Sequence, residues 1–389
     1  MIPVDFKRSV STILISCPKG LSLFLEKEVK DLNMPVMGSR PSAVMTSGNL
    51  SDCMILNLCL FTAHHVLYKV MEGVCRTPDD MYNAVVALPW EGLIPLSTTL
   101  CVTSTVKTPS IKDTRFANLR CKDAIVDRLA EKTGKRCNSG PDREGVVVHL
   151  FWQDERCILY LDTSGETLSR RGYRLIPGEA PMQETLAAGV VKATGWQPET
   201  KASFVNPMCG SGTIAIEAAL VSMRKRPGLL RRNFGFMQYN TFDRDLFANL
   251  KNEFSSTQLA KSSQTIVASD IDPKALASAQ QNAKAAGVES AIDFNVCDFS
   301  QTHVPTGKGI VCINPEYGFR MGTAAELETV YKRIGDFFKT RCAGYTGFVF
   351  TGNFDLVKKV GLKAGRKVRF YSGKLECRLY EYELYSGRK

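Results

Sequence analysis

Asn314, Pro315 and Tyr317 are the residues whose types and order are best suited to chemistry. They follow an apolar run at residues 309–313, which predicts a buried strand, and Gly318 comes next. The exocyclic amine of a purine is a poor nucleophile, because its lone pair is delocalised into the ring. The side-chain oxygen of Asn314 and the carbonyl of Pro315 can hold its hydrogens and turn the lone pair towards an electrophile. The ring of Tyr317 can stack on an extruded base, although Asn-Pro near Gly is also an ordinary turn.

A glycine loop nearer the middle of the chain could bind the electrophile. Residues 202–206 predict a short strand, and residues 214–223 predict the helix that follows the loop. The loop has neither a Walker Gly-Lys-Ser/Thr nor a full Gly-x-Gly-x-x-Gly, so it suits a ribose or an amino-acid group at a helix N-terminus. A turn that serves only the backbone is the alternative for the loop alone. The predicted contacts are Asn206, Met208, Cys209, Gly210, Ser211, Gly212 and Thr213.

Two carboxylates stand where the next two predicted strands end. Asp270 follows a strand at residues 265–269 and can accept hydrogen bonds from ribose hydroxyls. Asp298 follows a strand at residues 291–296 and can accept from an adenine amino group. Surface capping is the alternative for both, and capping the next helix fully explains Asp272. Together with the amine-binding residues, these groups predict S-adenosylmethionine as the cofactor.

Strands and helices alternate through the second half of the chain, which predicts an α/β fold with a doubly wound, largely parallel sheet. The expected strands are residues 202–206, 265–269, 291–296, 309–313 and 347–351, and the expected helices are 181–196, 214–223, 273–287, 324–341 and 354–360. Residues 367–371 and 376–385 predict a terminal antiparallel hairpin. A basic insertion must fill the long gap between Gly210 and Asp270.

The first half predicts a smaller α+β arrangement. We expect strands at residues 11–17, 43–46, 145–152 and 156–162, and helices at residues 21–32, 52–70 and 122–132. Gly, Ser, Arg and Pro then interrupt the pattern at residues 164–178, which we interpret as a domain junction.

The net charge of +11 is unevenly distributed. Residues 107–143 hold ten Lys/Arg against five Asp/Glu, and residues 358–389 hold ten against three. Residues 224–232 carry five Lys/Arg and no acid. Such clusters fit a polyphosphate partner, because neutralised phosphates release counterions, and a solvated surface is the alternative.

The remaining composition indicates a cytoplasmic protein with no membrane span or secretory signal, because no apolar stretch approaches about 20 residues. The chain has thirteen cysteines and four histidines, but it has no Cys-x-x-Cys pair. We therefore expect most of the cysteines to be small buried apolar residues, and we expect no metal site.

An ordered series of motifs resembles bacterial THUMP-domain methyltransferases that act on guanine N2 of 23S ribosomal RNA. The series comprises Cys121-Lys-Asp-Ala-Ile-Val-Asp-Arg128, Leu168-Ser-Arg-Arg-Gly-Tyr-Arg174, Ala180-Pro-Met-Gln-Glu-Thr-Leu-Ala-Ala188, Asn206-Pro-Met-Cys-Gly-Ser-Gly-Thr213, Ser269-Asp-Ile-Asp-Pro273, Asn314-Pro-Glu-Tyr-Gly318 and Leu375-Glu-Cys-Arg378. The similarity spans roughly residues 60–385.

This resemblance implies three domains. They are a ferredoxin-like segment at residues 1–62, a THUMP RNA-binding domain at 63–165 and a Rossmann-like class I methyltransferase domain at 166–389. It also implies that Pro181 and Thr185 border the methionine end of the cofactor. The implied partner is RNA, either 23S ribosomal RNA or a ribosomal precursor. Arg120 and Lys122, a basic pair on the THUMP-like helix, are candidate RNA contacts, and solvated surface is the alternative.

Three residues depart from the family pattern. Asn206 stands where the family usually has Asp, Gln183 replaces a usual Lys, and Glu316 replaces the second proline of Asn-Pro-Pro-Tyr. We expect methyl transfer to persist, because the Pro315 carbonyl and the Tyr317 ring are retained. Adenine N6 and transfer RNA guanine N2 stay open as alternative targets. A non-catalytic RNA-binding module is the alternative from a different functional class.

Overall fold

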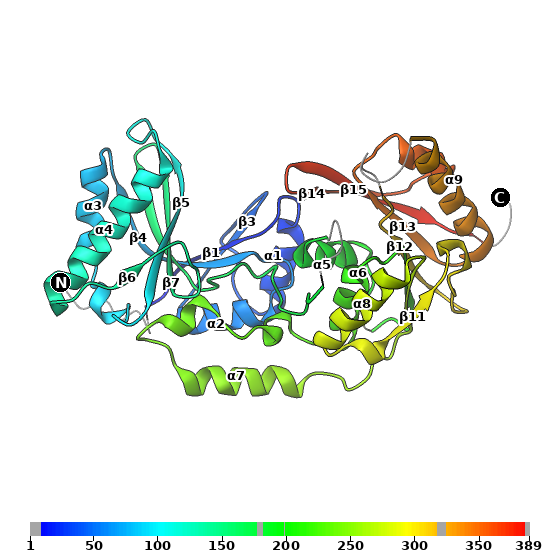
Figure 1. The fold of residues 1–389 in the computed structure, drawn as a ribbon, viewed down its shortest axis with the longest axis horizontal. Coiled ribbons are helices and arrows are strands. Elements are labelled where there is room, and N and C mark those ends of the chain that lie inside the picture. The colour runs from blue at the N-terminus through cyan, green and yellow to red at the C-terminus, as the bar shows by residue number, and fades with distance from the viewer. Residues whose placement is uncertain (1–8, 177–181, 198, 317–323, 386–389) are drawn as a thin grey trace. The chain divides into compact units, whose positions relative to one another are not determined.

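The computed structural model describes residues 9–176, 182–197, 199–316 and 324–385 (Figure 1). The chain forms two compact units. The N-terminal unit comprises Met1–Cys17, Leu25–Leu168 and Arg231–Glu253, and the C-terminal unit comprises Pro18–Phe24, Ser169–Leu230 and Phe254–Lys389.

The N-terminal unit is built on an eight-stranded sheet with the order β2-β3-β1-β4-β8-β7-β5-β6. The strands are β1 (Ser11–Ser16), β2 (Gly38–Arg40), β3 (Ala43–Gly48), β4 (His65–Val74), β5 (Thr99–Lys107), β6 (Asn138–Ser139), β7 (Val146–Gln153) and β8 (Arg156–Asp162). The helices are α1 (Ser22–Asp31), α2 (Leu50–Cys59), α3 (Pro78–Val86) and α4 (Thr114–Thr133). The predicted α+β character is therefore confirmed.

The prediction of one helix over residues 52–70 is wrong. Helix α2 ends at Cys59, and Leu60 has extended backbone angles (φ −77°, ψ 126°). From His65 onward the chain is strand β4, which pairs with both β1 and β8. Most of α2 is buried, and so are residues 60–63 and 66–68, so apolar residues continue from the helix into the strand and do not mark the boundary.

The C-terminal unit contains a seven-stranded sheet with the order β11-β10-β9-β12-β13-β15-β14. Its strands are β9 (Ser203–Pro207), β10 (Ile266–Asp270), β11 (Ile292–Val296), β12 (Gly309–Ile313), β13 (Thr346–Thr351), β14 (Lys367–Ser372) and β15 (Leu375–Glu383). The first five strands in that order pair in parallel, and β14 and β15 pair as an antiparallel hairpin. The predicted doubly wound sheet with a terminal hairpin is confirmed.

Helices cover this sheet. They are α5 (Glu184–Ala193), α6 (Thr213–Ser222), α8 (Pro273–Ala285) and α9 (Ala324–Arg341), with a 3-10 helix, η6 (Leu356–Val360), where we had expected an α-helix. Helix α6 contacts β9 and β10, and α8 contacts β10 and β11. Tyr331 and Phe338 of α9 share a buried core with Val311 of β12 and Val349 of β13.

Residues 231–253 pack in the N-terminal unit, although they lie between two segments of the C-terminal unit in the sequence. The segment contains the 3-10 helix η3 (Gly235–Gln238) and most of helix α7 (Arg244–Ser256). Phe236 donates its backbone N–H to the carbonyl of Thr163 over 3.0 Å, and the Tyr239 hydroxyl donates to the carbonyl of Asp162 over 3.2 Å. The rings of Phe234, Phe236, Phe242 and Phe247 form an aromatic cluster.

Phe236→Ala tests how strongly this segment is anchored. The ring is 1% exposed, so its removal leaves a cavity and should cost about 3–5 kcal/mol of unfolding free energy in the unit that holds it. Urea unfolding monitored by circular dichroism measures the change. Phe254→Ala, at a half-buried position, is the control and should cost clearly less. Equal losses in both variants would contradict the anchoring role.

Candidate active site

Parallel pairing brings the predicted site residues to one edge of the C-terminal sheet. Strand β9 lies between β10 and β12, with Pro207 paired to Ser269 and Val205 paired to Val311. Three chain segments therefore leave the sheet side by side at its carboxyl edge. They begin at Met208, Asp270 and Asn314, and ligands of open α/β sheets bind at such an edge. The glycine loop and the Asn-Pro segment thus open onto the same side of the sheet.

The loop after β9 has the backbone shape that its glycines allow. Gly210 and Gly212 have φ angles of 54° and 81°, in the left-handed region. A Cβ atom at position 212 would lie 2.8 Å from the Cβ of Ala279, so any other residue there would push α8 away. Met208 also has a positive φ, of 55°, which is uncommon for a residue with a side chain. Helix α6 begins directly after this loop, at Thr213.

Asp270 holds this loop in place. Its Oδ2 atom accepts the backbone N–H of Gly210 over 2.9 Å, and its Oδ1 atom accepts the N–H of Asp272 over 3.0 Å. Each carboxylate oxygen still has a lone pair for a further donor, as a ribose hydroxyl would supply. Asp272 caps α8 by accepting the N–H of Lys274 over 2.9 Å, as its sequence position indicated.

Asp298 lies after β11 and caps the 3-10 helix η5 (Phe299–Gln301). Its Oδ1 atom accepts the Ser300 N–H over 2.9 Å and the Arg333 guanidinium over 2.6 Å. Burial raises the pKa of Asp298, but the hydrogen bonds from Arg333 and Ser300 outweigh that effect, so its pKa lies below its usual value. The carboxyl is therefore ionised at neutral pH and can accept from an amino group.

Two asparagine oxygens at the carboxyl edge are buried and have no hydrogen-bond partner among the described residues. They are the Oδ1 atoms of Asn206 and Asn314. Asn206 is 1% exposed, and its Nδ2 atom donates to the carbonyl of Cys312 over 2.8 Å. A buried acceptor without a donor costs about 1–3 kcal/mol, so both oxygens favour a ligand that brings N–H groups. The amino group of S-adenosylmethionine and the amine of a purine both fit this requirement.

The chain after Asn314 is braced by helix α9. The Tyr331 hydroxyl lies 2.7 Å from Oγ1 of Thr351 and donates to the carbonyl of Glu316 over 3.4 Å. Pro315 is buried. Tyr317 and Pro181 lie outside the described residues, so their predicted roles stay predictions. Thr185 is fully buried on α5.

Sequence reasoning did not single out two apolar side chains beside Asp270. Ile271 is 68% exposed and Val296 is 55% exposed, and Val296 pairs with Asp270 across β10 and β11. Exposed apolar groups at a ligand edge are suited to an aromatic ring such as adenine. The sequence contains a signal for both residues, because each is an apolar residue next to a polar one at a strand end. Ile271 directly follows Asp270, and Val296 directly follows Asn295.

Asn282 was also missed, because nothing in the sequence marks an asparagine inside a helix. It is 1% exposed, and its Oδ1 atom accepts the backbone N–H groups of Leu175 and Ile176 over 2.9 and 3.3 Å. Its Nδ2 atom donates to the carbonyls of Ile176 and Ser211 over 3.1 and 3.2 Å. Asn282 therefore ties the cofactor loop to the segment that follows the Arg-Arg-Gly-Tyr-Arg motif.

That motif forms a buried polar cluster beneath the loop. Arg171 and Glu217 are 1% and 0% exposed, with Nε and Oε1 3.5 Å apart, and the Tyr173 hydroxyl donates to the same Oε1 atom over 3.1 Å. Burial raises the pKa of Glu217 to about 7, and the Arg171 guanidinium opposes that rise. Arg174 donates to Oγ1 of Thr213 over 3.2 Å and lies 3.5 Å from Glu184. The cluster thus connects the motif to α5 and to the first turns of α6, which follows the loop.

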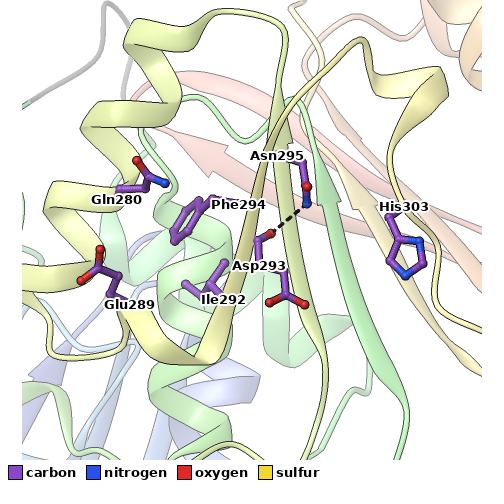
Figure 2. A pocket seen from close by; sticks show the side chains of 7 residues that line it. All are labelled: Gln280, Glu289, Ile292, Asp293, Phe294, Asn295 and His303. Carbon is purple, nitrogen blue, oxygen red and sulfur yellow. Dashed lines mark hydrogen bonds between the residues drawn. The ribbon is translucent and has the colours of Figure 1, made fainter.

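A surface depression of about 510 Å³ lies along the outer edge strand β11 (Figure 2). Its lining comes from α8, β11 and the two short connections beside them, and comprises Gln280, Glu289, Ile292, Asp293, Phe294, Asn295 and His303. None of these residues belongs to the glycine loop or to the Asn314 segment. The depression is therefore separate from the predicted site. The predicted site is located by the residues at the carboxyl edge of the sheet rather than by this depression.

The two candidate RNA contacts are already engaged within the N-terminal unit. Arg120 donates to Asp79 over 2.7 Å, and its guanidinium lies 4.0 Å from the centre of the Tyr82 ring. Lys122 forms an ion pair with Asp123 over 2.7 Å. Their role in RNA binding stays a prediction, and it would require these exposed ion pairs to rearrange.

The cysteines do not define a site. Eleven of the thirteen are buried, as predicted, and Cys209 and Cys297 are half-buried. Within the described ranges, no three His, Cys, Asp or Glu side chains are grouped so that they could hold a metal ion. The described helices include none with the length and apolar character to cross a bilayer.

Known proteins resemble the chain over nearly its whole length. Residues 171–381 match the family described as RMKL-like, methyltransferase domain, residues 75–162 match the THUMP domain, and residues 12–67 match the RlmL ferredoxin-like domain. Ribosomal RNA large subunit methyltransferase K/L of Syntrophotalea carbinolica is 34% identical over 96% of this chain and 53% of that protein. A protein of Synechocystis sp. named "Putative RNA methyltransferase" is 30% identical over 98% of each chain.

A solved structure, described as a putative methyltransferase complexed with SAH, has a TM-score of 0.87 at 26% identity, and the match covers 98% of this chain and 100% of that one. The fold is therefore that of a class I methyltransferase. The chain belongs to the RMKL-like methyltransferase family, with THUMP and RlmL ferredoxin-like domains before the catalytic domain, as its motifs predicted. It spans about half the length of the K/L relatives. The predicted boundaries at residues 62 and 165 stay predictions.

Asn282→Asp tests the tie between α8 and the cofactor loop. The variant keeps an acceptor for Leu175 and Ile176 but loses the donor to Ser211 and buries a charge. We expect faster amide hydrogen exchange in the loop and about tenfold weaker binding of S-adenosylhomocysteine by calorimetry. Asn295→Asp, on the exposed strand β11, is the matched control. The positioning role is wrong if both variants exchange and bind alike.

Glu217→Gln tests the buried cluster through its pH dependence. The pKa of this carboxyl is about 7 in the fold and near 4.3 when unfolded, so the folded state holds the proton longer. The stabilisation that this protonated carboxyl gives the fold is fully present below the pKa of the unfolded state and is lost as the pH rises through 7. The loss in the free energy of unfolding is on the order of a few kcal/mol. Melting temperatures at pH 5 to 8 should fall less steeply in the variant. Parallel profiles would show that Glu217 is already ionised throughout.

Proposed function

We propose that the protein transfers a methyl group from S-adenosylmethionine to guanine N2 in 23S ribosomal RNA. The observation that carries the proposal is the pair of unpartnered Oδ1 atoms of Asn206 and Asn314 at one sheet edge. They lie beside the loop whose Gly210 N–H binds Asp270. Asn206 and Asp270 can thus accept hydrogen bonds from the cofactor, and Asn314 can accept one from the purine amine.

The cofactor, when bound, supplies a methyl group activated by its sulfonium. Asp270 would accept from the ribose, Asn206 from the amino-acid group and Asp298 from the adenine, with Ile271 and Val296 against the adenine ring. Cys209, Ser211 and Thr213 complete the loop around it. These contacts leave the edge above Asn314 for the target base.

The residues of the Asn314 segment act on the amine. Asn314 Oδ1 accepts one hydrogen and the Pro315 carbonyl accepts the other, so the nitrogen lone pair is directed at the methyl carbon. Bound S-adenosylmethionine would supply the methyl carbon that bonds to this nitrogen as it leaves the sulfur, and the amine would release one proton to solvent. Catalysis here rests on orientation rather than on a strong base, since holding reactants in line can lower the barrier substantially.

RNA as the substrate is supported by charge and by relatedness. The chain carries a net charge of +11, and a THUMP domain precedes the catalytic domain. The K/L relatives are named as ribosomal RNA methyltransferases, and a relative that matches over its full length is named as an RNA methyltransferase. Guanine is favoured over adenine by the resemblance of the motif series. The retained Asn314 and Pro315 would serve either amine.

Asn314→Ala tests the orientation of the amine. Loss of its acceptor should lower the methylation rate by roughly 100-fold or more, because removal of one preorganised polar contact has effects of that size. Transfer of tritiated methyl groups to 23S ribosomal RNA that lacks the modification measures the rate, and mass spectrometry of digested nucleosides identifies the base. Calorimetry with S-adenosylhomocysteine should show nearly unchanged affinity.

Asn295→Ala is the matched control, because it removes an asparagine from the exposed strand β11 of the same unit. It should methylate at the wild-type rate. Wild-type activity in the Asn314 variant would remove this residue from the mechanism. A product carrying methyladenine would exclude guanine N2, and no incorporation into any RNA by the wild type would defeat the proposed function.

A further inference from the structure

The β14–β15 hairpin extends past the carboxyl edge of the catalytic sheet. Arg378 of β15 pairs with Thr351, the last residue of β13, and the hairpin continues beyond this pair to its turn at residues 372–375 (Figure 1). Strand β12, which leads to Asn314, is the other neighbour of β13. Neighbouring strands lie about 4.8 Å apart, so the Arg378 backbone lies roughly 10 Å from the Asn-Pro segment.

One face of this hairpin carries basic and aromatic side chains. Arg369 pairs directly with Arg378, Tyr371 pairs with Glu376, and Lys367 pairs with Tyr380, so these six residues lie on the same face. The alternating residues on the other face include Phe370, Cys377 and Leu379, all fully buried. We call the first set, together with Lys19 and Phe354, the hairpin face. On the hairpin face, Tyr380 is 5% exposed and belongs to the buried core shared with α9, whereas Lys367 and Arg369 are exposed and Tyr371 and Arg378 are half-buried.

The charges on the hairpin face are positioned by contacts within the protein. Arg378 donates from Nε and Nη2 to Oε1 of Glu376 over 2.9 and 2.8 Å, and Arg369 Nε lies 3.3 Å from the same oxygen. Two guanidinium groups thus share one carboxylate, which leaves one excess positive charge. The Arg369 side chain is 62% exposed, so that charge is available to a partner.

Aromatic rings lie directly beneath two of the cations. The Arg378 guanidinium lies 4.1 Å from the centre of the Phe354 ring, and Lys19 Nζ lies 4.4 Å from that of Tyr371. Lys19 comes from a distant part of the sequence and is held by its neighbours. Gly20 has a φ of 94° and packs against the carbonyl of Arg369, and the Phe24 ring stacks on Phe370 at 6.2 Å.

We propose that the hairpin face binds a single-stranded RNA segment next to the methylated nucleotide. Phosphates would contact Lys19, Lys367 and Arg369, and a base would stack on Tyr371 or on the Arg378 guanidinium. Cations interleaved with aromatic rings are the pattern that single strands require, because every base has a face to stack. This assignment also gives the Leu375-Glu-Cys-Arg378 motif a role at the active-site edge. It rests on the proposed function.

The test measures RNA binding rather than methyl transfer. The double variant Lys19→Ala/Arg369→Ala of the 389-residue chain is titrated with a single-stranded oligoribonucleotide of roughly 16 nucleotides at several salt concentrations. Each lost phosphate contact should reduce the slope of log affinity against log salt by about 0.7, so we expect a reduction of about 1.4. Tyr371→Ala should weaken binding by roughly five- to a hundred-fold with little change in slope.

Lys284→Ala/Lys308→Ala is the matched control, because both lysines are exposed. Lys308 directly precedes β12, so it lies at the amino ends of the parallel strands, opposite the carboxyl edge. The control should keep the wild-type slope. All variants should bind S-adenosylhomocysteine with the wild-type affinity, and this binding shows that they are folded. Equal slopes in the two double variants would overturn the hairpin assignment. Equal weakening on an RNA duplex would overturn the choice of a single strand. Failure of the wild type to methylate RNA overturns the proposed function instead.

Discussion

The parallel pairing of β9 with β10 on one side and β12 on the other determines where everything else can act. It makes three strands end at one level, so that the loops after Pro207, Asp270 and Ile313 face a common space. The Asn206 side chain reinforces this alignment by donating to the carbonyl of Cys312 on the neighbouring strand. A shift of one residue in either pairing would reverse the direction of the side chains and separate the acceptors proposed for the cofactor from those proposed for the amine.

Most of the C-terminal unit could be predicted from the sequence because its signals are local. The strand that contains Asn206, the glycines that require positive φ and the Asp272-Pro273 cap each follow from a few adjacent residues. The end of each strand predicts Asp270, Asp298 and Asn314 as site residues without knowledge of the strand order, since all parallel strands end at the same edge. The hairpin was predictable for the same reason, because two strand-like runs flank a Ser-Gly turn.

The features that escaped prediction depend on contacts between distant residues. Asn282 binds Leu175 and Ser211, more than 70 residues away in each case, and an asparagine within a helix does not reveal such partners. The four phenylalanines of residues 231–253 indicate burial but not which core receives them. The boundary between α2 and β4 within residues 52–70 is missed because buried apolar residues continue from the helix into the strand. Each of these errors arises from tertiary packing rather than from local preference.

The replacement of the family's usual Asp by Asn206 exchanges a charge for a structural bond. A carboxylate at this 1% exposed position would have no hydrogen to donate to the Cys312 carbonyl, and its burial would be costly until the cofactor amino group neutralised it. The amide instead donates to β12 and still offers one acceptor to the ligand. The loss of the charge should weaken attraction for the cationic end of the cofactor, whereas the added bond holds the two catalytic strands in register before any ligand arrives. The proposed site would therefore rely more on the carboxylates of Asp270 and Asp298 for affinity, and both carboxylates are held in place by backbone N–H groups.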